Sequence, residues 1–230
     1  MEFVQHAFFY MVLLCAASEK TKRHFQRICV TPPEVIGEEK MEASESPIKR
    51  NILITLVMIT ISVILCTLGF STANQPIDSI AVVWPRAILQ AVGTILFGGW
   101  GIVATIFAGM ITNAINVGTA HAILGYSIPN FLQSFIPAFY YRRILRKSDG
   151  EIKMLSFKSY LIFAAIVPNL LGALFGTFIL HSTREADLWF SISRWLIANI
   201  PITLVLGWPL LFFLGPTMAE ERLLIKGWWK

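Results

Sequence analysis

Charged residues are nearly missing from a long central part of this chain of 230 residues. Between Asn51 and Tyr141 the only formal charges are Asp78 and Arg86, in a sequence built mostly from aliphatic residues, Phe, Gly and Thr. One Asp, Lys or Arg at the centre of a membrane helix costs about 2.5 to 3.5 kcal/mol, whereas each Leu, Ile, Phe or Val contributes a few tenths favourably. We therefore predict an all-α integral membrane protein.

The apolar runs have the length that crosses a bilayer. A helix rises about 1.5 Å per residue, so roughly 20 residues cross the hydrocarbon core of about 30 Å. One run is too long for a single crossing, and the glycines of Gly98-Gly99-Trp100-Gly101 indicate a tight turn within it. We predict a six-transmembrane-helix bundle with spans at 51–71, 79–97, 100–117, 121–141, 157–180 and 192–214, the last ended by Gly215-Pro216.

The predicted organisation is a flexible N-terminal segment (1–50), a membrane domain (51–216) and a short cytoplasmic tail (217–230). The apolar run at 3–17 is short for a span and has no basic region before it, which is typical of neither an anchor nor a signal peptide. Met41 offers an alternative start. We expect residues 1–40 to be dispensable or wrongly assigned to the protein.

Basic residues predict the orientation. Lys49 and Arg50 precede the first span, and a basic loop follows the fourth span with Arg142, Arg143, Arg146, Lys147, Lys153 and Lys158. Positive residues near span ends favour the cytoplasmic side, so we expect both ends of the helical core in the cytoplasm and a multi-pass protein of the cell membrane. A solvated loop explains this charge better than a nucleic-acid patch does.

Polar residues inside the predicted spans gather toward the outer half of the bundle. They include pairs at helical spacing, such as Arg86 with Gln90 and Asn130 with Gln133, whereas the inner half is nearly all apolar. An Arg in lipid is costly unless it meets water, a partner or a ligand. We predict an outward-facing ligand pocket, closed below by packed apolar residues and lined by Trp84, Arg86, Gln90, Asn113, Asn130, Gln133, Asn169 and Asn199.

A purely structural role competes with this interpretation. Amides in membrane helices often form interhelical hydrogen bonds worth only about 0.6 kcal/mol. Trp84 and Trp195 can equally anchor the membrane interface. Gly172-x-x-x-Gly176 predicts close helix packing.

Several classes of chemistry find no support in the sequence. It contains no Gly-rich phosphate loop, no HExxH motif and no second intramembrane carboxylate for a proton relay. Cys15, Cys29 and Cys66 have neither disulfide-framework nor zinc spacing. We predict a protein that is not an enzyme, with no catalytic residue, metal or cofactor.

The hairpin Ile95-Leu96-Phe97-Gly98-Gly99-Trp100-Gly101, within a six-span chain that has an outward polar pocket, resembles the substrate-binding S component of energy-coupling-factor transporters. Such a component captures a vitamin-like micronutrient from outside and docks on a transmembrane coupling subunit driven by two ATPases. The resemblance implies a small-molecule ligand, with Arg86 pairing an anionic or carbonyl group, the amides fixing its orientation, and Trp84 stacking on it.

Other residues resemble the membrane-embedded sensor domains of bacterial histidine kinases and diguanylate cyclases. They are Val83-Trp84-Pro85, Asn113, Arg142-Arg143, Trp195 and Trp208-Pro209-Leu210-Leu211. This resemblance implies a sensory input module with a separate signalling partner. A structural subunit without a ligand is a third alternative, in which the amides only join helices.

Overall fold

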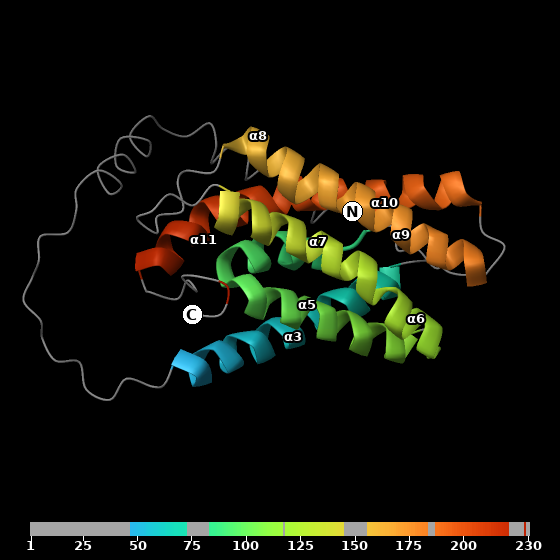
Figure 1. The fold of residues 1–230 in the computed structure, drawn as a ribbon, viewed down its shortest axis with the longest axis horizontal. Helices are drawn as coiled ribbons and strands as arrows, with labels where there is room; N and C mark the ends of the chain where they lie inside the picture. Colours follow the sequence, from blue (N-terminus) through green and yellow to red (C-terminus); the bar gives the residue numbers. More distant parts are fainter. Residues whose placement is uncertain are drawn as a thin grey trace, which may run out of the picture. The chain divides into compact units, whose positions relative to one another are not determined.

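The computed structural model describes residues 47–72, 83–116, 118–144, 156–183 and 187–220, together with Trp228, and the regular structure of these ranges is helical (Figure 1). The predictions for residues 1–46 lie outside the described residues, and so does Asp78, which the sequence places two helical turns before Arg86 as a possible ion-pair partner. The elements are α3 (Pro47–Thr72), α4 (Arg86–Ile88), η1 (Leu89–Gly93), α5 (Thr94–Asn116), α6 (Ala120–Gly125), α7 (Ser127–Phe139), η2 (Tyr140–Ile144), α8 (Phe157–Tyr160), η3 (Leu161–Ile166), α9 (Val167–Thr183), α10 (Leu188–Ile202), η4 (Thr203–Gly207) and α11 (Trp208–Glu220), where η marks a π-helical segment.

Four helical stretches in the described ranges are long and apolar enough to cross a membrane. They are Ile48–Thr67, Arg86–Asn116, Phe157–His181 and Leu188–Gly215. The predicted spans 79–97 and 100–117 both overlap the stretch Arg86–Asn116, and the predicted span 121–141 is divided by a turn at Tyr126. The structure therefore supports a multi-pass, all-helical membrane protein, and the count of six crossings stays a prediction.

The stretch Arg86–Asn116 reverses its direction at Gly98. Gly98 has φ 58° and ψ −131°, a conformation that residues with a side chain rarely adopt. A Cβ atom on Gly101 would lie only 2.7 Å from the carbonyl oxygen of Gly93, whereas eight residues of straight helix would separate the two by about 12 Å. The predicted turn is confirmed, and the segments before and after Gly98 form a helical hairpin.

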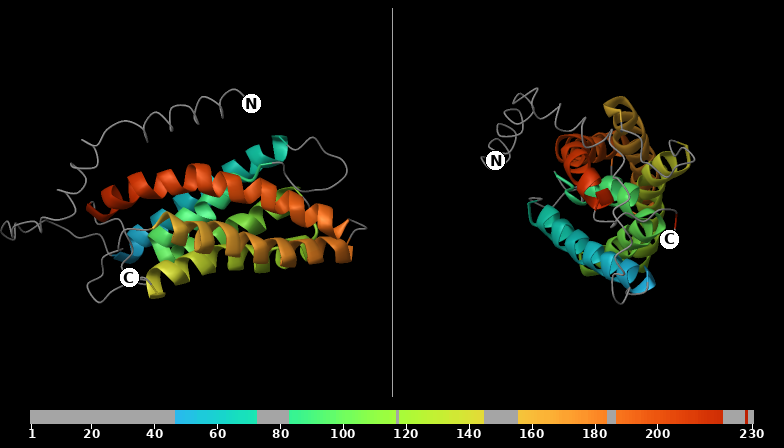
Figure 2. Two further views of the ribbon diagram at one scale, coloured as in Figure 1. Left: turned by 90° about the horizontal axis from the view of Figure 1, so that it is seen from above. Right: turned by 90° about the vertical axis from the view of Figure 1, so that its left-hand side faces the viewer.

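The part of α5 that follows Gly98 packs antiparallel to α7. Thr105 on α5 meets Ser134 on α7, and Gly109 on α5 lies against Asn130 on α7, so partner numbers fall along one helix as they rise along the other. The most extensive contacts join α3 to α5, α5 to α7, α7 to α9 and α9 to α10, and these helices run side by side in Figures 1 and 2. We call the two ends of this bundle the Gly98 end and the Asn116 end.

Prolines adjoin the π-helical segments. Pro168 and Pro209 each follow such a segment after one intervening residue, η3 and η4 respectively. A proline ring clashes with the carbonyl group four residues earlier, and both of these carbonyls lie inside the widened turn. The π-helical turn therefore lets the helix continue through the proline.

The final helix departs from its prediction at both ends. α10 begins at Leu188, and α11 continues through Gly215 and Pro216 to Glu220. The prediction that Gly215-Pro216 ends the helix is wrong, because a proline removes only one hydrogen bond, while helical residues around it can keep their own backbone groups paired.

The Gly98 end is fastened by residues far apart in the sequence. Nε of Arg142 donates to the carbonyl oxygen of Ile95 at 3.0 Å, and its Nη2 donates to that of Leu96. The backbone N–H of Gly99 donates to the carbonyl oxygen of Trp228 at 2.9 Å. The prediction that Arg142 belongs to a solvated loop is wrong, because its charge satisfies carbonyl groups at the end of a helix.

Apolar side chains fill the interior toward the Gly98 end. The buried cluster consists of Ala91, Val92, Ile95, Leu96, Tyr141, Tyr160, Ala164 and Leu211. One of its two tyrosines, Tyr160, donates its hydroxyl hydrogen to the carbonyl oxygen of Thr203 at 3.0 Å. This packed layer closes the bundle on the Gly98 side of the polar residues described below.

The conformation of Gly98 predicts an effect of substitution. Gly98→Ala should lower the free energy of unfolding by about 1 to 3 kcal/mol, because a Cβ atom disfavours its backbone angles. Gly215→Ala is the matched control, since its Cβ atom would meet nothing within 4 Å. Thermal unfolding in detergent measures both variants, and equal midpoints would contradict the strained turn.

Candidate functional site

Arg86 is buried at the start of the hairpin, with 1% of its surface exposed. Its Nη2 donates to the carbonyl oxygen of Thr105 at 3.1 Å, and its Nη1 lies 3.9 Å from Sγ of Cys66. Its Nε–H has no hydrogen-bond partner among the described residues, and no described carboxylate forms an ion pair with it. Among the described residues, the buried guanidinium therefore has uncharged partners only.

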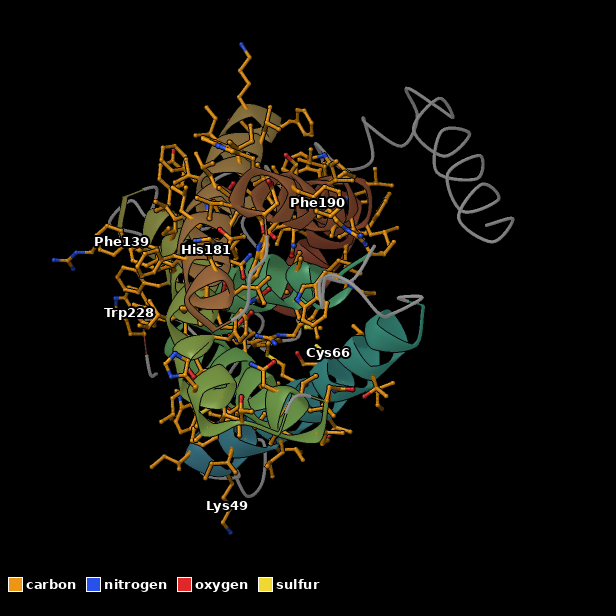
Figure 3. The ribbon with its side chains drawn as sticks, turned by 90° about the vertical axis from the view of Figure 1, so that its right-hand side faces the viewer. Lys49, Cys66, Phe139, His181, Phe190 and Trp228 are labelled. Carbon is orange, nitrogen blue, oxygen red and sulfur yellow. The ribbon has the colours of Figure 1, made fainter. Side chains whose placement is uncertain are left out.

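Gly109 makes room for this charge. A Cβ atom at that position would lie 2.9 Å from Nη2 of Arg86 and 2.5 Å from Nδ2 of Asn130. The guanidinium and the Asn130 amide thus converge on one glycine of α5. Viewed from the Asn116 end in Figure 3, Cys66 lies on the side of α3 that faces the other helices, which is the side Arg86 contacts.

Four buried amides form a hydrogen-bonded chain across three helical segments, and we call Gln90, Asn130, Gln133 and Asn169 the amide chain. Nε2 of Gln90 donates to Oδ1 of Asn130 and to Oε1 of Gln133, both at 3.2 Å. Nε2 of Gln133 donates to Oδ1 of Asn169 at 2.7 Å. The chain joins the first arm of the hairpin to α7 and α9.

The direction of the amide chain is fixed by its last member. Nδ2 of Asn169 donates to the backbone carbonyl oxygen of Ala165 at 2.7 Å, and a carbonyl oxygen only accepts. Asn169 must therefore present its own oxygen to Gln133, and Gln133 must present its oxygen to Gln90. Oε1 of Gln90 is left buried and without a hydrogen-bond partner among the described residues.

Small residues hold the chain in place. A Cβ atom at Gly172 would lie 2.7 Å from Cδ of Gln133, and one at Gly176 would lie 2.5 Å from Cη2 of Trp195. The predicted packing role of Gly172-x-x-x-Gly176 is confirmed by these contacts. The glycines let α9 approach both α7 and α10.

Sequence reasoning missed the neutral partners of Arg86. Thr105 supplies its carbonyl oxygen to Arg86, while its hydroxyl lies 2.7 Å from the hydroxyl of Ser134. Cys66 is fully buried in α3. The available signal was that Arg86, Thr105 and Gly109 face one another once the chain reverses at Gly98.

Three of the predicted site residues stand apart from the amide chain. Trp84 is half-buried, and its backbone N–H donates to the carbonyl oxygen of Ala198 at 3.2 Å. Asn113 is buried near the Asn116 end, and Asn199 is buried in α10, where its Nδ2 donates to the carbonyl oxygen of Trp195 at 2.8 Å. The structure thus joins Arg86, Gln90, Asn130, Gln133 and Asn169 and leaves Trp84, Asn113 and Asn199 outside that group.

The donors in this group suit an anion better than a metal ion. The guanidinium is the one charge in this group, and the amides and the thiol beside it are neutral. The local potential is therefore positive and repels a cation. In the ranges that the structure describes, no three His, Cys, Asp or Glu side chains are placed to hold a metal. A search of protein-family models, curated proteins and solved structures finds no match to this chain.

Interrupting the amide chain should destabilise the bundle. Gln133→Leu should cost about 1 to 3 kcal/mol of unfolding free energy, because it leaves Oδ1 of Asn169 and a donor of Gln90 buried without partners. The control Asn116→Leu changes an exposed amide that donates to Thr112 of its own helix and should stay within about 0.5 kcal/mol. Chemical unfolding followed by circular dichroism would detect the difference, and equal effects would count against a cooperative chain.

Proposed function

We propose that this chain is a membrane-embedded, small-molecule binding subunit, the substrate-capture component of a micronutrient uptake transporter energised by partner ATPases. The observation that carries the proposal is the burial of Arg86 without a carboxylate partner among the described residues. A charge moved from water into a protein interior costs several kcal/mol even after relaxation. An anionic ligand that pairs with Arg86 would offset that cost.

The open hydrogen-bonding groups narrow the ligand chemistry. Nε–H of Arg86 is an unused donor and Oε1 of Gln90 is an unused acceptor, and the two residues are four apart in one helical segment. A ligand that satisfies both brings an anionic oxygen for the guanidinium and an N–H or O–H group for the amide oxygen. A carboxylate or phosphate with a neighbouring N–H or hydroxyl group meets this requirement.

Helix geometry supports a site near mid-membrane. Thr105 and Gly109, which flank the guanidinium, lie about 10 to 16 Å along α5 from Gly98 at the usual helical rise. A core of about 30 Å would place them near its middle. We propose six crossings with both ends of the helical core cytoplasmic, so that the ligand enters from the Asn116 end and the apolar cluster below closes the path.

A sensory input module is the second candidate function. The observation that favours it is the continuation of α11 to Glu220, past the predicted end of the last span at Leu214. A helix that leaves the bundle without a break is suited to transmit a shift to a cytoplasmic signalling partner.

Co-purification separates these candidates. The chain is purified from membranes, and the small molecules and proteins that elute with it are identified by mass spectrometry. A bound micronutrient with ATPase partners supports capture for transport, and a kinase or cyclase partner supports sensing. Loss of the co-purified small molecule in Arg86→Ala, with thermal unfolding still cooperative, is expected if Arg86 holds it. Retention of the molecule would remove Arg86 from the site.

Gln90→Glu provides a second test of the charge. A carboxylate one turn from Arg86 should neutralise it internally and abolish stabilisation by small carboxylates and phosphates. The unfolding midpoint without ligand should fall, because Asn130 and Gln133 lose the Nε2 donor of Gln90. Asn116→Asp adds the same charge at an exposed position and should leave both quantities unchanged. Anion stabilisation that stays intact in Gln90→Glu would contradict the proposed pairing.

A further inference from the structure

One face of α10 carries three buried polar atoms that lack partners within the described ranges. They are Oγ of Ser191, Nε1 of Trp195 and Oδ1 of Asn199. The residues are four apart, so their side chains lie along one stripe of the helix. Ser191 is 1% exposed and Asn199 is 3% exposed.

Several other buried hydroxyl groups are bonded within their own helix, whereas that of Ser62, like that of Ser191, has no partner among the described residues. Those of Thr112, Thr177 and Thr203 donate to the carbonyl group four residues earlier, at 2.6, 2.6 and 2.7 Å. This local bond is the usual way for Ser and Thr to satisfy themselves in a helix. Ser191 does not make it, so its hydroxyl remains available to another molecule.

An aromatic wall borders the stripe. The Trp195 ring lies 6.3 Å from the Tyr126 ring, centroid to centroid, at an interplanar angle of 22°. Gly176 of α9 lies against the edge of the same indole, which fixes the ring between two neighbouring elements. Ligand sites commonly combine such apolar rings with a few polar groups of defined position.

The stripe itself is uncharged. Asp187 uses its carboxylate to accept the N–H of Phe190 at the exposed start of α10, and Arg194 lies over the Phe190 ring at 5.5 Å. The open groups are one N–H donor, one carbonyl acceptor and one hydroxyl. They complement a neutral ligand that offers a carbonyl oxygen and an N–H group.

We propose that Ser191, Trp195 and Asn199 form a second binding site, for a small uncharged planar ring that carries a lactam or primary carboxamide. The ring lies against the Trp195 and Tyr126 side chains, its carbonyl oxygen accepts from Nε1 of Trp195, and its N–H donates to Oδ1 of Asn199. This site is distinct from the anionic site at Arg86 and does not depend on it.

Thermal unfolding of the purified full chain with two matched pairs of probes tests the proposal. Nicotinamide and uracil are the neutral probes, and nicotinate and orotate are their carboxylate counterparts. At least one neutral probe should raise the unfolding midpoint of the wild type by several degrees, and Asn199→Leu should bind it roughly tenfold more weakly or worse. Ser191→Ala, which removes only a hydroxyl, should show a smaller loss and keeps the test valid if Asn199→Leu does not fold.

Two controls separate the outcomes. Thr177→Val removes a buried hydroxyl that is already bonded within its own helix and should keep the response to the neutral probe. Gln90→Glu should lose any response to the carboxylates and keep the response to the neutral probe, so failure of one site leaves the other testable. The proposal is overturned if neither neutral probe shifts the wild type, if the shift persists in both α10 variants, or if Thr177→Val abolishes it.

Discussion

Reversal of the chain at Gly98 is the constraint on which the rest of the structure depends. Without it Arg86 and Thr105 would stand about 28 Å apart on one straight helix instead of sharing a hydrogen bond of 3.1 Å. The reversal also aligns Gly109 with the guanidinium and places the apolar cluster below it. A single residue with a conformation suited to glycine therefore assembles the polar centre from segments that are distant in sequence.

Hydropathy predicted the membrane class and the turn because both follow from local composition. It did not predict the continuation of α11 through Pro216 or the turn at Tyr126. Each π-helical segment also adds a residue to its turn, so the face that points inward shifts relative to a count of 3.6 residues per turn. Four such segments lie in the described chain, so periodicity alone does not identify which residues face the interior.

The sequence predicted the site as a set of polar residues, and the structure shows which of these residues contact one another. Gln90 donates to both Asn130 and Gln133, and Gln133 donates to Asn169, a pattern that depends on the register of three helical segments. Asn199 looked equivalent to these amides in the sequence, yet it belongs with Ser191 and Trp195 on α10. Residue type identified the candidates, and only helix register could group them.

Arg142 has a structural role that its assignment to a charged loop did not predict. Its side chain donates to the two carbonyl oxygens just ahead of Gly98, which joins η2 to the tip of the hairpin. During synthesis a positive charge at that point would help to orient the chain, and in the finished bundle the same charge clamps two segments together. Removing this charge would therefore impair both membrane insertion and the stability of the folded bundle. An assay that measures only how much protein reaches the membrane would not separate the two defects.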